Sequence, residues 1–477
     1  MTSHNDVVPS NGAMTAYNRL ARRILAPTLD IVRHTHVMKC LQELEESQWY
    51  SPQAIHDLQS QRLQETIGHA YSHVPFYRRM FDARGLSPSS IREPSNLTKL
   101  PILTKDLVRA NLQDMVADNY PKNRLLVSRT GGSTGSPLVF YTTHEDWISH
   151  GRSRGLLAME WADVHMGDRV ATFPKTFGRP TRKERLLEPI IRRFQRSLVL
   201  GRQGISEETL PEIIHALATM RPKTIAAYPS VLALLAQHIR DTGVPAPQLH
   251  ALLTGGELMF EHQRTPIREV FGKEPFSRYG SHENSLLGTE CDQHSGFHMF
   301  AQDLVVEVVD DSGQPVPTGV EGHILITNLH ARGMPFIRYD TGDIGEWATE
   351  LCPCGRGLPL IKHLTGRSCD IIVTPSGRRV AGTGVGMSRM ALLGISGLQL
   401  VQEQLDTVQV RLVVPRDGND EDRQRVKQGV TDILHRSLGN DMSLDIRFVD
   451  HIEPTPAGKY VPVVSYVSRQ QGAAQSQ

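Results

Sequence analysis

A stretch rich in glycine and hydroxyl side chains is the part of this sequence best suited to bind an anion. Residues 128–143 read SRTGGSTGSPLVFYTT, between a strand-like run at 124–127 and an alternating apolar run at 138–141. Glycine lets backbone N–H groups approach an anion closely, and serine and threonine add short donors, so such a loop can hold phosphate oxygens. The stretch lacks the Gly-Lys-[Ser/Thr] of a Walker loop, and a plain hairpin turn explains this loop alone equally well.

Carboxylates and one lysine end four further runs. LLTGGE ends at Glu257, RYGSHE at Glu283, RYDTGD at Asp343 and the turn PTPAGK at Lys459. Each of these charged side chains stands at a turn or at a strand-to-loop junction, which is where ligands sit in layered α/β proteins. As a simpler interpretation, Glu283 and Asp343 would cap loops and Lys459 would be a surface lysine.

The elements that must position these runs alternate between strand and helix. Strands are predicted at 169–173, 224–227 and 251–254, and helices at 207–220, 229–242 and 260–271. This alternation favours parallel pairing in a layered α/β core, and ligands bind beyond the carboxyl ends of parallel strands, where these turns lie. From 299 to 347 the pattern changes to β, with alternating runs at 304–309 and 322–327.

The two ends of the chain have different patterns from this core. Residues 16–84 are predicted to be helical, with one helix starting at Ser51-Pro52. Beyond Gly366-Arg367 we expect a small α+β unit, with strands at 371–374, 398–413 and 444–449 and a charged helix at 420–437. A chain of 477 residues suits more than one domain, and we predict domains at 1–365 and 366–477.

The composition excludes several classes of protein. Contents of 39% hydrophobic and 22% charged residues are ordinary for a chain with a sizeable core. The net charge of +1 argues against a general nucleic-acid or membrane-surface binder. No apolar run approaches the ~18 residues needed to span a bilayer, and without an apolar signal segment a cytoplasmic location is expected. The basic stretch 175–196 could attract an anionic substrate, although a solvated helix face is the simpler interpretation.

Taken together and in this order, the stretches resemble the adenylate-forming superfamily of acyl-CoA synthetases, luciferase and peptide-synthetase adenylation domains. The resemblance is strongest to the phenylacetate–CoA ligase family and its relatives in capsule and exopolysaccharide loci. It covers about residues 60–460 and rests on HVPFYR at 73–78, TGGSTGSP, LLTGGE, RYGSHE, RYDTGD with LTGRSCD, and PTPAGK. It implies a large N-terminal adenylation domain of layered α/β sheets plus a β section. A small α+β C-terminal domain would rotate between two half-reactions.

The resemblance also implies a reaction. A carboxylic acid is activated with ATP to an acyl-adenylate, and the acyl group is then transferred to CoA. Catalysis of this kind is mostly positioning and electrostatic stabilisation. Two alternatives stay open: transfer to a carrier protein or an amine, including an amino sugar in polysaccharide modification, and a non-catalytic relative that binds nucleotide. The acid and the oligomeric state are open too, although a homodimer is a common outcome for soluble enzymes.

Individual residues take implied roles in this reaction. The β- and γ-phosphates would be held by Thr130, Gly131, Gly132, Ser133, Thr134 and Gly135. The rest of the nucleotide would lie against Gly255, Gly256, Glu257, Gly280, Ser281 and Tyr279, which would stack on the adenine. Glu283 would bind Mg²⁺, Asp343 would accept hydrogen bonds from the ribose hydroxyls, and Arg367 would lie near the ribose and phosphate. Lys459 would bridge the carboxylate and the α-phosphate.

Four positions depart from the usual pattern of the family. Ser136 replaces a lysine common in the phosphate loop, and His282 stands where threonine or serine usually precedes the Mg²⁺-binding glutamate. Asp340 stands where arginine is common, and Cys369 takes a hinge position usually held by aspartate or lysine. These departures bear more on the thioesterification step and its acceptor than on adenylate formation.

A cluster of cysteines lies in the second half of the chain. Cys291 precedes His298 by seven residues, and Cys352 and Cys354 follow in a Cys-Pro-Cys-Gly turn. Three thiolates and one imidazole match a closed, structural zinc site, with His294 as an alternative ligand. Family relatives look similar here, and such a site would staple the loop after RYGSHE to the β section. Buried cysteines without a metal are the simpler interpretation.

Overall fold

The computed structural model describes most of the chain. The described residues are 14–121, 125–129, 138–143, 145–173, 193–200, 209–367, 371–381, 393, 395, 397–414, 420–453 and 461–467. Within these ranges no helix is long and apolar enough to cross a membrane.

Residues 16–82 are mostly helical, as predicted. A continuous run consists of α1 (Ala16–Leu20), the π-helical turn η1 (Ala21–Leu25) and α2 (Ala26–Arg33). It is followed by α3 (Val37–Ser47), α4 (Pro52–His73), α5 (Pro75–Asp82) and α6 (Lys105–Ala110). The hydroxyl of Ser51 accepts a hydrogen bond from the Ala54 N–H, and Pro52 opens α4, so the predicted helix start is confirmed.

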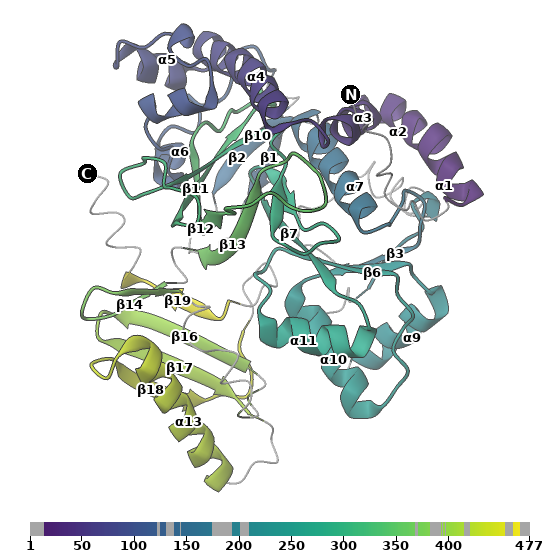
Figure 1. Cartoon of the computed structure of the whole chain (residues 1–477), viewed down its shortest axis with the longest axis vertical. Helices are drawn as coiled ribbons and strands as arrows, with labels where there is room; N and C mark the ends of the chain where they lie inside the picture. Colours follow the sequence, from purple (N-terminus) through teal and green to yellow (C-terminus); the bar gives the residue numbers. More distant parts are fainter. Residues whose placement is uncertain are drawn as a thin grey trace, which may run out of the picture.

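The centre of the molecule is one sheet in the order β10-β11-β12-β13-β9-β8-β7-β6-β5-β3-β4 (Figure 1). Its parallel half is formed by β4 (Ser197–Val199), β3 (Val170–Thr172), β5 (Thr224–Ala227), β6 (Ala251–Gly255) and β7 (Pro275–Ser281). The helices of this half are α7 (Gly151–Trp161), which follows η5 (Glu145–His150), α9 (Leu210–Met220), α10 (Pro229–Thr242) and α11 (Glu261–Phe271). The predicted strand and helix alternation with parallel pairing is therefore confirmed.

Antiparallel strands complete the same sheet. They are β8 (Ser285–Thr289), β9 (Phe297–Met299), β10 (Leu304–Val309), β11 (Glu321–Asn328), β12 (Tyr339–Trp347) and β13 (Leu360–Arg367). A separate antiparallel pair joins β1 (Leu125–Arg129) to β2 (Val139–Thr143). The β section is thus continuous with the parallel core, because β8 pairs directly with β7.

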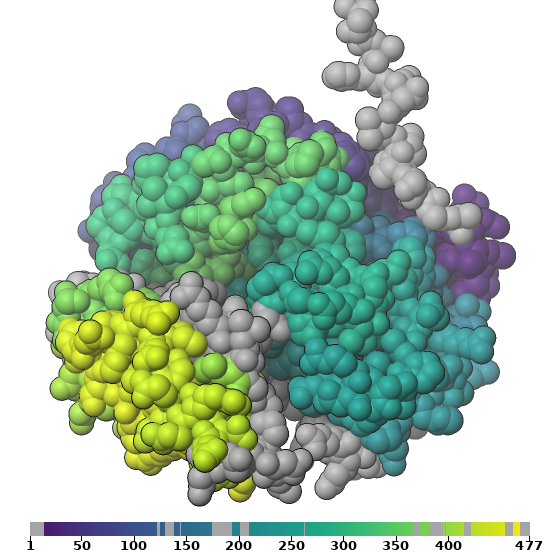
Figure 2. All heavy atoms as spheres, turned by 60° about the horizontal axis from the view of Figure 1, so that its bottom comes forward, coloured from purple at the N-terminus to yellow at the C-terminus, as the bar shows by residue number. Residues whose placement is uncertain are grey.

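A second, four-stranded sheet in the order β18-β17-β16-β19 lies towards the C-terminus. It contains β16 (Gly397–Gln404), β17 (Thr407–Val413), β18 (Ser443–Phe448) and β19 (Val463–Ser465), with α13 (Asp420–Leu438) packed on it and the pair β14 (Ile371–Val373) and β15 (Arg379–Ala381) beside it. These elements have a hydrophobic cluster of their own. Figure 2 shows them as a yellow lobe beside the rest of the chain.

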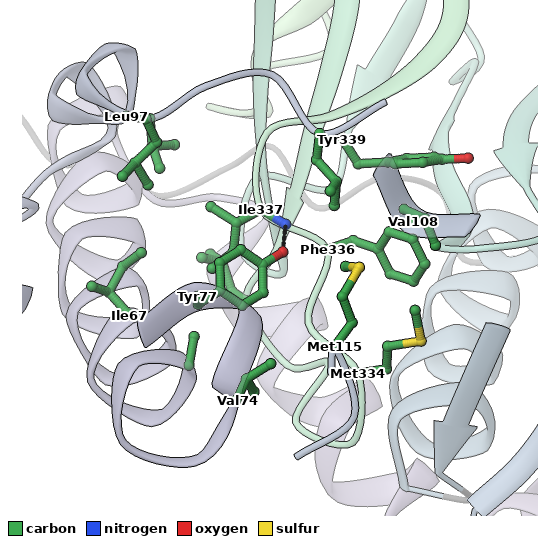
Figure 3. Packing of buried hydrophobic residues seen from close by; sticks show 14 of the residues in the cluster. Ile67, Val74, Tyr77, Leu97, Val108, Met115, Met334, Phe336, Ile337 and Tyr339 are labelled. Atoms are coloured by element: carbon green, nitrogen blue, oxygen red, sulfur yellow. Dashed lines mark hydrogen bonds between the residues drawn. The ribbon is translucent and has the colours of Figure 1, made fainter. Parts of the chain in front are cut away.

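The helical N-terminus packs on the β section through a buried cluster around Tyr77 (Figure 3). The Tyr77 side chain is 1% exposed. Its hydroxyl donates to the Pro335 carbonyl over 2.9 Å and accepts from the Ile337 N–H over 3.2 Å. These two hydrogen bonds fix the backbone at Pro335 and Ile337, immediately before the strand that carries RYDTGD.

We predict that Tyr77→Phe lowers the free energy of unfolding by about 1–3 kcal/mol, because it leaves a buried N–H and a buried carbonyl without their partner. Urea denaturation measures this loss. The matched control is Tyr71→Phe, which removes an exposed 3.0 Å hydrogen bond to Asp82 and should cost less than about 0.5 kcal/mol. Equal losses in the two variants would contradict the role given to the Tyr77 hydroxyl.

Candidate functional site

Part of the predicted site lies outside the described residues. This applies to the phosphate-loop positions 130–136, to Cys369 and to Lys459. The strands on either side of the loop, β1 and β2, pair with each other in antiparallel fashion. Arg367 is described by its backbone, which pairs with Asp343 in the β12–β13 ladder.

The LLTGGE run turns closely against the neighbouring strand. Gly255 pairs with Arg278 of β7, and a Cβ at Gly255 would lie 3.0 Å from the Arg278 carbonyl oxygen. Gly256 has φ +84°, a conformation that favours glycine. The Glu257 carboxylate accepts a 3.2 Å hydrogen bond from the Ser230 N–H at the start of α10. Desolvation lowers the pKa of Arg278 to about 10, which leaves a guanidinium cation beside this strand end at neutral pH.

Two tyrosine hydroxyls hold the carboxylates of RYGSHE and RYDTGD. Tyr279 donates to Asp343 over 2.8 Å, and Tyr339 donates to Glu283 over 2.6 Å. The pairing is reciprocal, because each motif contributes a tyrosine and, four residues later, a carboxylate. Tyr279 is 8% exposed and Tyr339 is fully buried, and Figure 3 shows the Tyr339 hydroxyl directed away from the other labelled side chains.

The turn that presents Glu283 is tight. Gly280 pairs with Leu286 across the β7–β8 hairpin, and a Cβ there would lie 2.7 Å from the Ser285 carbonyl oxygen. The Ser281 hydroxyl accepts a 3.1 Å hydrogen bond from the Asn284 N–H. A small cavity beside Glu283 is lined by Tyr141, Trp147, Arg154, Asn328 and Phe336 among others.

A buried ion network lies behind this turn. At its centre Asp303, 2% exposed, contacts His330 Nε2 at 3.0 Å and Arg62 at 3.2 Å through Oδ1. Its Oδ2 lies 3.6 Å from both His150 Nδ1 and the Arg154 Nε. The two imidazole rings are stacked, with centroids 3.6 Å apart.

The charges in this network are set by competition between burial and pairing. Burial opposes ionisation of Asp303, but the charges and hydrogen bonds of His330 and His150 hold its pKa well below the usual range. Burial likewise opposes the charge on His150, but the neighbouring Asp303 carboxylate and Cys40 sulfur nevertheless raise its pKa to about 10. Burial lowers the pKa of His330 to about 4. One of the two stacked rings is therefore protonated at neutral pH.

Arg154 connects this network to the turn that carries Glu283. The Arg154 side chain is 1% exposed and donates to the Asn284 carbonyl over 2.9 Å. The Asn284 side-chain oxygen accepts from Asn328 over 3.3 Å. Sequence reasoning missed these residues, because they lie on separate elements and form no local motif.

The structure brings the predicted cysteine cluster together. The ligand atoms of Cys291, His298, Cys352 and Cys354 all lie within 4.8 Å of one another. Cys291 and Cys352 sulfurs are 3.6 Å apart, and Cys354 Sγ is 3.3 Å from His298 Nε2. In a tetrahedral zinc site, bond lengths of about 2.3 Å to sulfur place two sulfurs roughly 3.7 Å apart. The donor set and its spacing therefore fit zinc.

Local contacts distinguish His298 from His294 and favour the thiolate form of Cys354. His294 lies 3.2 Å from a carboxylate oxygen of Glu290, so the alternative ligand is held elsewhere. The hydrogen bond from Cys291, followed by that from His298, lowers the pKa of Cys354 well below its usual value.

Comparison with known proteins shows that the chain is similar to phenylacetate-coenzyme A ligases and to a capsule protein. A family model described as the CapK C-terminal domain matches residues 372–466. A phenylacetate-coenzyme A ligase of Thermus thermophilus is 27% identical over 408 residues, which cover 81% of this chain and 84% of that protein. Protein CapK of Staphylococcus aureus is 25% identical over 415 residues, covering 84% and 87%.

A solved structure has the same fold. It is a 2-hydroxyisobutyryl-CoA ligase in the postadenylation state, in complex with R3-HIB-AMP. It superposes with a TM-score of 0.70 at 19% identity, covering 88% of this chain and 91% of that one.

We predict that His150→Gln makes unfolding depend on pH differently from the wild type. The folded-state pKa of about 10 exceeds the usual 6.5, so the folded protein keeps a proton that the unfolded chain releases between these values. The stabilisation is complete below about pH 6.5 and is lost as the pH rises towards 10. The difference in unfolding free energy between wild type and variant should therefore shrink by at least about 1 kcal/mol over this window.

Urea denaturation at several pH values measures this difference. The control is His451→Gln, an exposed histidine whose pair with Glu453 is screened by water and should contribute less than about 0.5 kcal/mol. A His150→Gln difference that stays constant from pH 6.5 to pH 10 would refute the assignment of the proton.

Proposed function

We propose that the chain is an adenylate-forming enzyme, related to the phenylacetate–CoA ligases and CapK, that activates a carboxylic acid with ATP and transfers the acyl group to CoA. The observation that carries this proposal is the reciprocal pairing of Tyr279 with Asp343 and of Tyr339 with Glu283. It holds two carboxylates, from motifs far apart in the sequence, each on the tyrosine of the other motif. This is the arrangement that a nucleotide with its metal ion requires.

In this proposal each carboxylate has its own task. Asp343 accepts hydrogen bonds from the ribose hydroxyls, and its bond from Tyr279 orients the carboxylate for them. The Tyr279 ring borders the adenine together with Gly255, Gly256 and Glu257 at the neighbouring strand end. The carboxylate bond fixes the direction of the ring axis, which lowers the entropic cost of nucleotide binding.

Glu283 suits a hard cation. Its carboxylate is presented by a tight turn, is oriented by the Tyr339 hydroxyl and borders a small cavity. Mg²⁺, when bound, supplies positive charge against the charge that develops on the phosphates. The protein's own contribution is to keep the carboxylate oriented, through Tyr339 and through the Arg154 hydrogen bond to the Asn284 carbonyl.

Lys459 is the cation that contacts the reacting carboxylate and the α-phosphate in this proposal. Arg367 lies near the ribose and phosphate, and residues 130–135 hold the outer phosphates. We propose that residues 366–477 act as a small domain that brings Lys459 to the site and later withdraws it. The match of residues 372–466 to one family model supports treating this part as a unit.

A second candidate differs only in the acceptor. The acyl group would pass to a carrier protein or an amine, such as an amino sugar. The match of residues 372–466 to a CapK C-terminal domain favours this second candidate. The C-terminal part is the one that would rearrange for the second half-reaction, in which the acceptor reacts. Product analysis with CoA, carrier and amine acceptors distinguishes the two candidates, since each acceptor yields a product of different mass.

We further propose that Cys291, His298, Cys352 and Cys354 hold one structural zinc ion. Four protein ligands leave no open position for water, so the ion would join the loop after β8 to the β12–β13 loop.

Purified protein should contain about one zinc per chain, and Cys354→Ser should lose it, as measured by mass spectrometry of the metal content. Cys40→Ser is the matched control, because Cys40 is a buried cysteine outside the cluster, and it should retain the metal. Wild-type protein without stoichiometric metal after zinc supplementation would refute the site.

ATP–pyrophosphate exchange with a panel of carboxylic acids, in Mg²⁺ and without CoA, tests the adenylation step. We expect exchange with one class of acid. Lys459→Ala should bind ATP normally but lose exchange by about a hundredfold or more, because it removes a charge contact made in the transition state. Lys427→Ala, an exposed lysine on α13, is the control and should exchange like the wild type. Unchanged exchange in Lys459→Ala would refute the role of this lysine.

A further inference from the structure

The N-terminal helical run α1–η1–α2 carries an exposed apolar stripe. The exposed fractions are 41% for Leu20, 57% for Ile24, 76% for Ile31 and 64% for Val32. Helical spacing places these side chains along one face. Four of the thirteen large exposed apolar side chains among the described residues thus fall within residues 20–32. Such a concentration marks an interaction surface.

The opposite face of the run is firmly attached to the protein. Arg22 pairs with Glu45 at 2.5 Å and with Glu160 at 2.9 Å. The Asn18 amide donates to the Met166 carbonyl over 2.9 Å and to Asp168 over 3.0 Å. The run lies at the periphery of the molecule (Figure 1). Because these contacts fix the helix by its inner face, the exposed stripe points permanently outwards.

An apolar groove lies under the same helices. It is open to solvent, and its walls include Leu25, Leu29, Ile148, Leu156, Met166 and the half-exposed Phe194. Two cationic side chains, Arg33 and Arg152, line it as well. An apolar wall with two guanidiniums fits an amphiphile that has an anionic head.

The two guanidiniums of the groove lack a carboxylate partner within ion-pair distance among the described residues. Desolvation, followed by repulsion from Arg33, lowers the pKa of Arg152. The nearest carboxylate, Asp30, already accepts hydrogen bonds from the Thr35 hydroxyl and from the backbone N–H groups of residues 37 and 38. A bound anion between the two arginines would relieve their repulsion.

The charge of this segment selects the kind of partner. Residues 14–39 contain five basic side chains (Arg19, Arg22, Arg23, Arg33 and Lys39) and one acidic side chain, Asp30, a net charge of +4 against +1 for the whole chain. A second copy of the chain is disfavoured, because a two-fold contact on the stripe would set exposed Arg19 and Arg23 against the same residues of the other copy. An anionic lipid surface has both the charge and the apolar depth that the face requires.

We propose that this face binds the surface of a bilayer that contains anionic phospholipid. The stripe of Leu20, Ile24, Ile31 and Val32 enters the interface. The groove receives a lipid phosphate between Arg33 and Arg152, with an acyl chain along its apolar wall. This attachment is peripheral and independent of the reaction proposed above.

Flotation of the full chain with vesicles tests the proposal. Vesicles of phosphatidylcholine with phosphatidylglycerol should carry the protein upwards, and vesicles of phosphatidylcholine alone should not. Binding should weaken as salt screens the arginines. Ile24→Asp combined with Ile31→Asp, and separately Arg33→Gln combined with Arg152→Gln, should each lower the partition coefficient by about tenfold or more.

Matched controls keep the test specific. Leu351→Asp alters a side chain that is 71% exposed elsewhere, and Arg240→Gln removes an exposed arginine of α10, so both should float like the wild type. Thermal melting verifies that every variant is folded. Absence of wild-type binding to anionic vesicles would overturn the proposal. So would light scattering that shows a dimer lost in the Ile24/Ile31 variant, because the occupant of the face would then be a second copy.

Discussion

The candidate site depends on two hydrogen bonds that cross between RYGSHE and RYDTGD. The strands that carry these motifs, β7 and β12, are separated in the sheet by β8, β9 and β13. Four steps of about 4.8 Å would place them roughly 19 Å apart in a flat sheet, beyond the reach of a tyrosine and an aspartate. The 2.8 Å bond from Tyr279 to Asp343 therefore shows that the sheet is not flat here. β9 pairs with β13 only at Leu360 and Ile361, whereas Asp343 lies opposite Arg367 at the other end of β13, so β8 and β9 do not hold β7 and β12 apart at the site. The shape of the sheet therefore determines where the two carboxylates lie, so a change in one would change the other.

The surrounding structure supports this shape of the sheet from behind. The Tyr77 hydroxyl of α5 accepts a hydrogen bond from the Ile337 N–H just before β12. Arg154 of α7 donates to the Asn284 carbonyl next to Glu283. Asp303 connects Arg154 to Arg62 of α4 and to two histidines. Burying this many charges is costly unless each is paired, so the network contributes more to a unique arrangement than to overall stability. The N-terminal helices thus reach the site through one aspartate.

Local patterns were enough to predict most elements. The strand at 224–227 and the helix at 229–242 have the predicted bounds, because a Tyr-Pro turn separates an apolar run from a helical period. The sequence also indicated the cysteine cluster, but the choice between His294 and His298 needed the contact of His294 with Glu290. Asp303 could not be predicted, because its partners lie far away in the sequence and on different elements. The roles of residues 130–135 and Lys459 stay predictions, since they lie outside the described residues.

The most direct test of the account is calorimetric titration of ATP with Mg²⁺ into wild type, Asp343→Asn and the control Asp310→Asn. Asp310 is an exposed turn carboxylate that accepts hydrogen bonds from the backbone N–H groups of Ser312 and Gln314. The account predicts that Asp343→Asn weakens ATP binding by about tenfold or more, as expected for the loss of charged hydrogen bonds, while Asp310→Asn binds like the wild type. Wild-type affinity in a folded Asp343→Asn variant would contradict the account, because the carboxylate held by Tyr279 would then not contact the nucleotide.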